Sequence, residues 1–209
     1  MILRKLFGAK GYRIIKNGIW RDQPIFSMVL GICSALAITN RVENAIAMGA
    51  GVTFVLMASS LVISPLRTLI PRRARMITYM ITIASFVIMV DKFLKAFYPD
   101  ISEALGPYVG LIITNCIIMG RAEGFYIQNK LHHSLLDGLS NGIGYSYALI
   151  SIAIVREILG FGTLLGVKVT PAGWTNWVVM TMAPGAFFLL GIFLWITRTL
   201  ANIDPESNR

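Results

Sequence analysis

The chain alternates between long stretches that lack charged residues and short connections that carry them. The stretches without Asp, Glu, Lys or Arg are residues 23–40, 44–66, 76–90, 104–120, 138–155 and 169–197. A helix needs about 20 mostly apolar residues to cross a bilayer, so the shorter stretches must continue past a charge. The third, for example, would run past Asp91 and Lys92 towards Phe97. Barrel strands would show alternating segments of about 10 residues, and none occur. We therefore predict an all-α, polytopic membrane protein with six transmembrane helices.

Composition supports this class. Only 14% of the 209 residues are charged and 56% are hydrophobic, whereas a soluble domain is about 25% charged. These values exclude a water-soluble globule and a disordered chain, and two cysteines exclude a disulfide framework. The net charge of +9 could suggest nucleic acid binding. Because the basic residues alternate with the spans, their role in topology explains them, and we expect no nucleic acid partner.

The distribution of basic residues predicts the orientation. Most of them fall in the N-terminal arm, between spans two and three, between spans four and five, and in the tail: Arg4, Lys5, Lys10, Arg13, Lys16, Arg21, Arg67, Arg72, Arg73, Arg75, Arg121, Lys130, Arg198 and Arg209. The side richer in Lys and Arg is cytoplasmic, so both termini should face the cytoplasm. We divide the chain into a basic cytoplasmic arm (1–22), a single six-helix membrane domain (23–200) and a C-terminal tail (201–209).

Spans one and four differ from the others. Both are short, both contain Pro and Gly, and each holds one of the two cysteines, Cys33 and Cys116. The tripeptide Ile-Thr-Asn occurs at 38–40 and again at 113–115, and an Arg-x-Glu follows each span. Short, interrupted segments at corresponding positions of two halves are typical of inverted repeats. We predict two inverted three-helix repeats, about 23–98 and about 104–200, with helices one and four interrupted. Spans that are merely tilted or poorly delimited are the alternative.

The two cysteines allow two interpretations. Free cysteine behaves as a small apolar residue, so Cys33 and Cys116 need no special role in six membrane helices. The chemical alternative is iron ligation by thiolate, and an iron–sulfur cluster normally takes four cysteines. His132 and His133 lie in the connection between spans four and five and cannot complete the set. If metal binds here, a second copy or a homologous partner must supply the missing ligands.

Two segments of the chain match a known family. Residues 30–37 (LGICSALA) and 109–123 (VGLIITNCIIMGRAE) resemble the signature segments of the D subunits of sodium-translocating NADH:quinone reductases. The resemblance covers nearly the whole chain and extends to residues 91–96, 136–138, 155–157 and 182–188. The homologous E subunits of Rnf-type complexes tend to have Cys-Pro where this chain has Cys33-Ser34, so we favour the quinone reductases.

The resemblance implies a function. The D and E subunits of that family are similar six-span proteins, inserted in opposite orientations in the bacterial inner (plasma) membrane. Together they hold a [2Fe-2S] cluster through two cysteines each, and the matching positions here are Cys33 and Cys116. The cluster relays electrons across the membrane between flavin-bearing and iron–sulfur subunits of a sodium pump that oxidises NADH and reduces ubiquinone. The expected partners are therefore the E subunit, the other subunits and the lipid bilayer, and this chain alone holds no complete active site.

Motifs for other cofactors are absent from the sequence. It contains no Walker loop, no Gly-x-Gly-x-x-Gly, and no threonine motif for flavin attachment, so we expect neither NADH nor covalent flavin in this chain. Three alternative functions remain open. The chain could be the E subunit of an Rnf-type ferredoxin:NAD oxidoreductase, a stand-alone secondary transporter, or an assembly scaffold without a redox role.

Ionisable residues in membrane spans are candidates for function. Asp91 with Lys92, and Arg156 with Glu157, lie near the ends of spans three and five. We interpret both pairs as residues that reach the interface or pack against other subunits rather than as ion sites. We also expect Arg41 with Glu43, and Arg121 with Glu123, to fix the interrupted helices by pairing.

Small and polar residues complete the expectations. Gly138, Gly142 and Gly144 in span five predict close helix packing. Thr39, Asn40, Thr114 and Asn115 are expected to satisfy backbone groups freed beside the breaks. Trp174, Trp177 and Trp195 are interpreted as anchors at the membrane interface.

Overall fold

The structure is a computed structural model and describes residues 25, 28–164, 167–168 and 177–201. Its α-helices are α2 (Ile32–Ile38), α3 (Val42–Leu66), α4 (Arg75–Phe97), α5 (Pro99–Ile113), α6 (Cys116–Arg121), α7 (Leu131–Gly160), α8 (Val178–Thr181) and α9 (Ala183–Ala201). A 3₁₀ turn, η2 (Arg72–Ala74), precedes α4, and a π-helical turn, η3 (Ala122–Tyr126), follows α6. The predicted basic arm and Trp174 lie outside the described residues.

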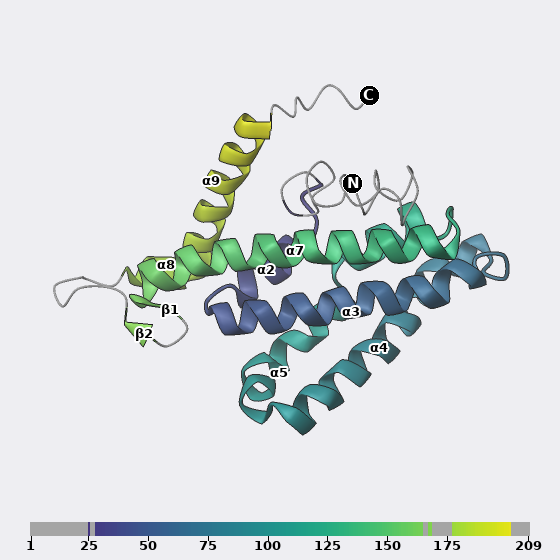
Figure 1. Ribbon diagram of the computed structural model, residues 1–209, viewed down its shortest axis with the longest axis horizontal. Coiled ribbons are helices and arrows are strands. Elements are labelled where there is room, and N and C mark those ends of the chain that lie inside the picture. The colour runs from purple at the N-terminus through teal and green to yellow at the C-terminus, as the bar shows by residue number, and fades with distance from the viewer. Residues whose placement is uncertain (1–24, 26–27, 165–166, 169–176, 202–209) are drawn as a thin grey trace, which may run out of the picture.

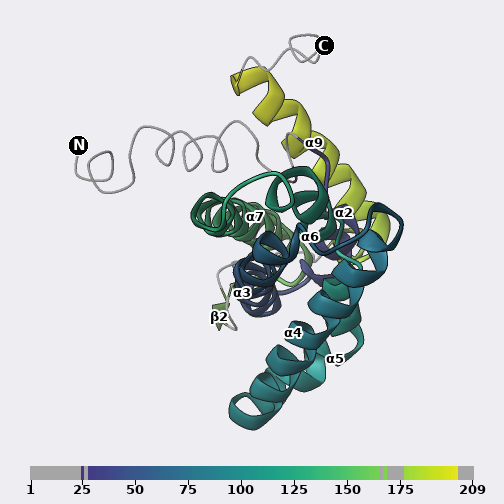
Figure 2. The ribbon, with the colours of Figure 1, turned by 90° about the vertical axis from the view of Figure 1, so that its right-hand side faces the viewer.

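Helices α3 and α7 form the centre of the molecule (Figure 1). A Cβ atom at Gly49 would meet Ser146, and one at Gly142 would meet Thr53. From the first of these contacts to the second, the residue number on α3 rises from 49 to 53 and the number on α7 falls from 146 to 142, so the two helices are antiparallel. Figure 2 views this pair nearly end-on, with α9 to its upper right and α4 and α5 to its lower right.

Small residues set the distance between α3 and α7. A Cβ at Gly142 would lie 2.7 Å from Oγ1 and Cγ2 of Thr53, and one at Gly138 would lie 3.2 Å from the carbonyl oxygen of Leu56. Both are closer than ordinary van der Waals contact, so a side chain fits only if a helix moves. Small residues at such contacts let helix backbones approach in a membrane. The packing role predicted for Gly138 and Gly142 is confirmed.

We expect Gly142→Val to destabilise the fold. The added side chain would overlap Thr53 of α3, and overpacking of this kind costs about 1 to 3 kcal/mol. Gly191→Val in α9 is the matched control, because no heavy atom lies within 4 Å of a Cβ built there. Unfolding by sodium dodecyl sulfate in mixed micelles measures both variants. Equal stability of the two would contradict the close packing of α3 and α7.

The described helices include membrane-length segments. Three are long and apolar enough to span a bilayer, namely Val42–Leu66, Arg72–Phe97 and Leu131–Gly160, and Ala183–Thr199 forms a shorter apolar helix. The third span was expected to pass Asp91 and Lys92 towards Phe97, and α4 does end at Phe97. The helical membrane class is therefore confirmed within the described part of the chain.

Two stretches of non-helical backbone occur where the sequence predicts interrupted spans. Gly31 has a positive φ of 80° and precedes α2, and Val29 before it has φ 57°. Thr114 and Asn115 separate α5 from α6. Helix α5 begins at Pro99, several residues before the charge-free stretch 104–120, because charged residues are tolerated at a helix end. Proline is favourable at this first position because its missing N–H would have no partner in the helix.

The last predicted span contains a break that the charge pattern does not predict. Met182 is extended, with φ −80° and ψ 163°, and it separates α8 from α9. Gly185 at the start of α9 packs against the backbone of Val179 and Met180, where no Cβ fits. Before this segment, β1 (Thr163–Leu164) pairs antiparallel with β2 (Val167–Lys168), and the other regular elements among the described residues are helical.

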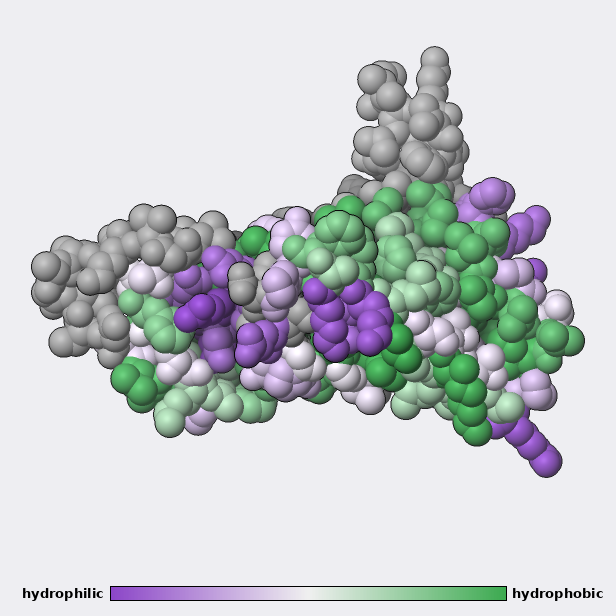
Figure 3. All heavy atoms as spheres, turned by 90° about the horizontal axis from the view of Figure 1, so that it is seen from below, coloured by the Kyte–Doolittle hydropathy of each residue, from purple (hydrophilic) through white to green (hydrophobic). Residues whose placement is uncertain are grey.

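Much of the surface is hydrophobic. The face on which α4 and α5 lie carries broad apolar areas interrupted by compact hydrophilic groups (Figure 3). Helix α4 exposes Ile77, Ile81 and Phe93 among others. Between α3 and α4 lies a pocket of about 810 Å³ in which Glu43 is the charged lining residue. Such a surface fits a chain surrounded by lipid and other apolar protein.

Candidate functional site

Cys33 and Cys116 both lie in the first turn of a short helix that follows non-helical backbone. Cys33 is the second residue of α2, which starts after the left-handed Gly31. Cys116 is the first residue of α6, which starts after Asn115. Both thiols are free and exposed. The two cysteines therefore occupy equivalent local positions in the two interrupted segments.

The residues beside the cysteines meet at Tyr145 of α7. Ser34 and Tyr145 share a short hydrogen bond between their hydroxyl oxygens. The Asn115 amide Nδ2 lies 3.4 Å from Ser34 Oγ and 3.3 Å from Tyr145 Oη. Ser34, Asn115 and Tyr145 are fully buried. We call these three residues the break cluster, because they join the two non-helical stretches.

The protons of the break cluster can be assigned. Ser34 Oγ donates to the carbonyl oxygen of Gly31 at 2.9 Å, which uses its only hydrogen. Tyr145 must then donate its proton to Ser34 Oγ, and the Asn115 amide donates to both hydroxyl oxygens. The remaining Asn115 oxygen, Oδ1, accepts from the backbone N–H of Ile117 at 3.3 Å and caps α6. The predicted role of Asn115 beside the break is confirmed.

The break cluster brings both cysteines to one region of the molecule. Cys33 precedes Ser34 and Cys116 follows Asn115, and both of these neighbours bond to the Tyr145 hydroxyl. Within the described residues, no group of three or more His, Cys, Asp and Glu side chains could hold a metal ion. Any metal held by these two thiols would therefore need ligands from outside this part of the chain.

Gly31 is required by the same arrangement. Its φ of +80° is a conformation that residues with a side chain rarely adopt. In addition, a Cβ atom there would lie 2.9 Å from Cε2 of Tyr145 and 3.4 Å from Oδ1 of Asn115. The backbone before α2 thus lies against one edge of the tyrosine ring.

Arg156 of α7 binds the carboxyl ends of two short helices. Its guanidinium donates to Leu36 O and Thr39 Oγ1 at the end of α2, at 3.2 and 2.6 Å. It also donates to the carbonyl oxygens of Met180, Thr181 and Met182 around the break between α8 and α9, at 3.1, 3.2 and 3.4 Å. Carbonyl groups at a helix end have no partner inside the helix, and a cation placed there satisfies them.

Glu157, the next residue of α7, binds the amino-terminal end of α3. Its Oε2 accepts from the backbone N–H of Val42, the first residue of α3, at 2.7 Å. Arg156 is 2% exposed and Glu157 is 4% exposed. The interpretation of this pair as interface-seeking or subunit-packing residues is wrong, because both side chains are enclosed by the chain itself. They fix α2, α3 and α8 to α7.

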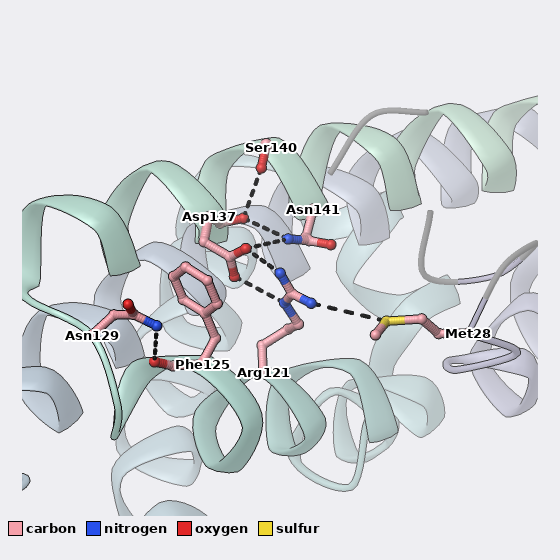
Figure 4. A network of polar contacts seen from close by, with 7 residues as sticks. All are labelled: Met28, Arg121, Phe125, Asn129, Asp137, Ser140 and Asn141. Carbon is pink, nitrogen blue, oxygen red and sulfur yellow. Dashed lines mark hydrogen bonds and ion pairs between the residues drawn. The ribbon is translucent and has the colours of Figure 1, made fainter. Parts of the chain in front are cut away.

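At the other end of α7 lies a buried ion pair (Figure 4). Arg121 of α6 donates through Nε to Asp137 Oδ2 at 2.9 Å and through Nη2 to Asp137 Oδ1. Asn141 donates to the Asp137 side chain and backbone at 3.0 and 2.9 Å. The guanidinium also lies 5.4 Å from the ring centre of Phe125. Helix α6, which carries Cys116, is thereby held to α7.

Glu123 bonds to a different helix. Its two oxygens accept from Arg75 Nη1 at 3.2 Å and from Tyr79 Oη at 2.8 Å, both on α4. The expected pairing of Arg121 with Glu123 is therefore wrong, because Arg121 faces α7 while Glu123 faces α4. Asp91 forms an ion pair with Lys95, one helical turn away on α4, at 2.7 Å.

Tyr145 and Asp137 do not stand out as functional residues in the sequence. In the sequence, Asp137 is notable only as part of segment 136–138, one of the segments that resemble the known family. The signal for both is a span rich in glycine that also carries polar side chains, since Gly138, Gly142 and Gly144 surround them in sequence. Such a span has room on one face for a neighbouring helix, and its polar groups must bond there.

Comparisons with known proteins cover most of the chain. The sequence profile described as "Rnf-Nqr subunit, membrane protein" matches residues 12–194. The chain is 46% identical over 192 residues to the D subunit of the Na(+)-translocating NADH-quinone reductase of Chlamydia felis, covering 87% of this chain and 90% of that protein. It is 47% identical over 204 residues to the protein of that name from Chlamydia trachomatis serovar L2, covering 92% and 94%. The protein of that name from Psychromonas ingrahamii is 45% identical over 202 residues, covering 93% and 96%.

Proposed function

The chain belongs to the Rnf-Nqr family of membrane subunits, and we propose that it is the D subunit of a sodium-translocating NADH:quinone reductase. Its relatives are named as subunits of that oxidoreductase complex. In this function the chain holds no complete active site. NADH and the flavins bind to other subunits, and this chain contributes a membrane-embedded step of electron transfer.

Cys33 and Cys116 are the proposed ligands, as half of an intramembrane [2Fe-2S] centre. The break cluster carries this proposal, because it brings two thiol-bearing segments that are far apart in sequence to one tyrosine. The donor set fits such a centre. Both thiols are free and exposed, so they are accessible to iron and to two further thiolates from a homologous partner, the E subunit.

The residues of the chain would hold and orient the ligands. A bound iron–sulfur cluster supplies one-electron redox chemistry. Ser34 follows Cys33 and Asn115 precedes Cys116, and the two bond to each other and to Tyr145. The backbone segments that carry the cysteines therefore cannot move apart without breaking buried hydrogen bonds. Arg156 and Arg121 fix α2 and α6 from either end of α7. The low dielectric of this packed interior strengthens each of these bonds.

The proposed topology is six spans in two inverted repeats, about 23–98 and about 104–200, in a bacterial inner membrane with both termini cytoplasmic. Two observations support the repeat. In each half, a short helix with a cysteine in its first turn precedes a long helix, α2 before α3 and α6 before α7. In addition, α3 and α7 are antiparallel, as inverted copies of one helix would be.

Replacing either cysteine tests the proposed iron centre. In the purified complex, we expect Cys33→Ser and Cys116→Ser each to remove the signal of the centre in electron paramagnetic resonance (EPR). Iron content should fall by the amount of that centre, and quinone reduction should fall to background, because three thiolates remain where four are needed. The stoichiometry of the complex is the control and should not change, since neither side chain is buried in the fold.

The opposite result would identify another function. Unchanged iron content and turnover in both variants would contradict the iron centre and leave the stand-alone transporter open as the alternative. Iron absent from the intact wild-type complex would favour a scaffold without a redox role.

A further inference from the structure

The two interrupted segments are joined through a single side chain of α7. Ser34 in α2 and Asn115 before α6 each bond to the Tyr145 hydroxyl. The direct bond between Ser34 and Asn115, at 3.4 Å, is the longest of the three. Tyr145 therefore supplies the closer contacts of the junction.

The tyrosine ring contributes a second point of contact. Cε2 lies 2.9 Å from where a Cβ of Gly31 would be, so the backbone before α2 rests on the ring edge. The hydroxyl at the ring tip then reaches Ser34, one helical turn further along the same segment. Two contacts from a rigid ring fix the segment in position and in direction.

The junction is buried and its hydrogen bonds are satisfied. Ser34, Asn115 and Tyr145 have no exposed surface, so water cannot replace a lost bond without entering the fold. In such surroundings an unmade hydrogen bond is unfavourable, and the arrangement with all bonds formed is strongly preferred. Removing the hydroxyl of Tyr145 would leave the Ser34–Asn115 bond as the remaining polar link within the break cluster.

We propose that Tyr145 is a positioning residue that fixes the spacing of Cys33 and Cys116. One consequence of this inference rests on the proposed function: the spacing of the two cysteines sets the electronic properties of the shared iron centre. The spacing itself is a property of the chain without iron. It can therefore be tested separately.

The first experiment needs no iron. The chain has two cysteines, so nitroxide spin labels can be attached to Cys33 and Cys116 of the full-length chain in detergent. Dipolar broadening of the EPR spectrum reports the distance between the labels. We expect one defined distance in the wild type and a wider spread in Tyr145→Phe, which keeps the ring but loses the hydroxyl.

Tyr147→Phe is the matched control. Tyr147 lies two residues further along α7, and its side chain is 65% exposed. It loses the same atom from the same helix, and we expect the wild-type distance in this variant. An equally narrow distribution in Tyr145→Phe would overturn the proposal, and so would equal broadening in both variants.

The second experiment uses the assembled complex. In Tyr145→Phe we expect the iron to be retained while the EPR line shape and the midpoint potential of the centre shift, with neither change in Tyr147→Phe. An unaltered line shape and potential in Tyr145→Phe would contradict the effect on the centre. If the wild-type complex has no iron centre, the proposed function fails, and the spin-label distances still decide whether Tyr145 positions the cysteines.

Discussion

Arg156→Met is expected to lower the free energy of unfolding by about 3 to 5 kcal/mol. The guanidinium is buried and donates to five acceptors in α2 and around the α8–α9 break. Methionine fills a similar volume but leaves those acceptors without a donor. Each buried acceptor left unsatisfied costs about 1 to 3 kcal/mol, and partial relaxation reduces the total. Unfolding in mixed micelles, followed by tryptophan fluorescence, measures the difference.

Two further variants sharpen this prediction. Arg156→Lys keeps the charge but cannot reach acceptors in two directions, so we expect an intermediate loss of stability. Arg73→Met removes an exposed arginine from the turn before α4, and we expect a change within about 0.5 kcal/mol. Stability of Arg156→Met close to that of Arg73→Met would contradict the role of Arg156 in holding α2 and α8.

Asp137→Ala is the second change for which we expect a large effect, of about 3 kcal/mol or more. The carboxylate accepts two hydrogen bonds from Arg121 and one from Asn141. Its removal leaves the Arg121 guanidinium without its counter-ion, and the Arg121 side chain is only 11% exposed. Breaking a buried pair on one side costs about 3 to 5 kcal/mol, because an uncompensated charge stays in the interior.

A double mutant tests whether the loss of stability comes from the charge left unpaired on Arg121. In Arg121→Met with Asp137→Ala the buried pair is replaced by neutral side chains, so we expect part of the lost stability to return. Asp91→Ala is the control, because its pair with Lys95 is more exposed and should contribute about 0.5 kcal/mol or less. If Asp137→Ala behaves like Asp91→Ala, the ion pair does not hold α6 to α7.

The membrane class was predictable because it depends on where charges are absent. Helix α4 ends at Phe97, as expected, since a helix of that length needs the residues after Asp91 to cross a bilayer. The break at Met182 was not predictable in the same way. Residues 169–197 form one uncharged stretch. The break lies just before Pro184, which does not fit the interior of a continuous helix, and Gly185 packs against the backbone of Val179, and hydropathy reports neither feature.

The candidate site was predictable only in part. Cys33 and Cys116 stand out because they are the two cysteines and because both follow segments rich in helix-loosening residues. The residues that hold them do not stand out. Tyr145 and Asp137 are polar residues in a span that also contains Ser, Asn and Gly. Their role depends on which residues of α2 and α6 face them, and this is a property of three-dimensional packing between segments that are distant in sequence.

The burial of Arg156 and Glu157 was not predictable from the sequence either. From the sequence they are adjacent opposite charges near the end of a span, where long side chains usually reach towards the interface. In the structure, the carbonyl groups of Met180, Thr181 and Met182 surround the guanidinium. These acceptors become available only because α8 ends early, and no pattern of charge or hydropathy indicates that end.

The acceptors of Arg156 also impose an order on biosynthesis. Leu36 and Thr39 leave the ribosome before Arg156 does, whereas Met180, Thr181 and Met182 emerge after it. A nascent chain that stops before residue 180 therefore contains this cation with two of its five acceptors. Its burial can be completed only when α8 and the break after it have been made, so a segment translated after Arg156 closes the site that anchors α2, which is translated before it.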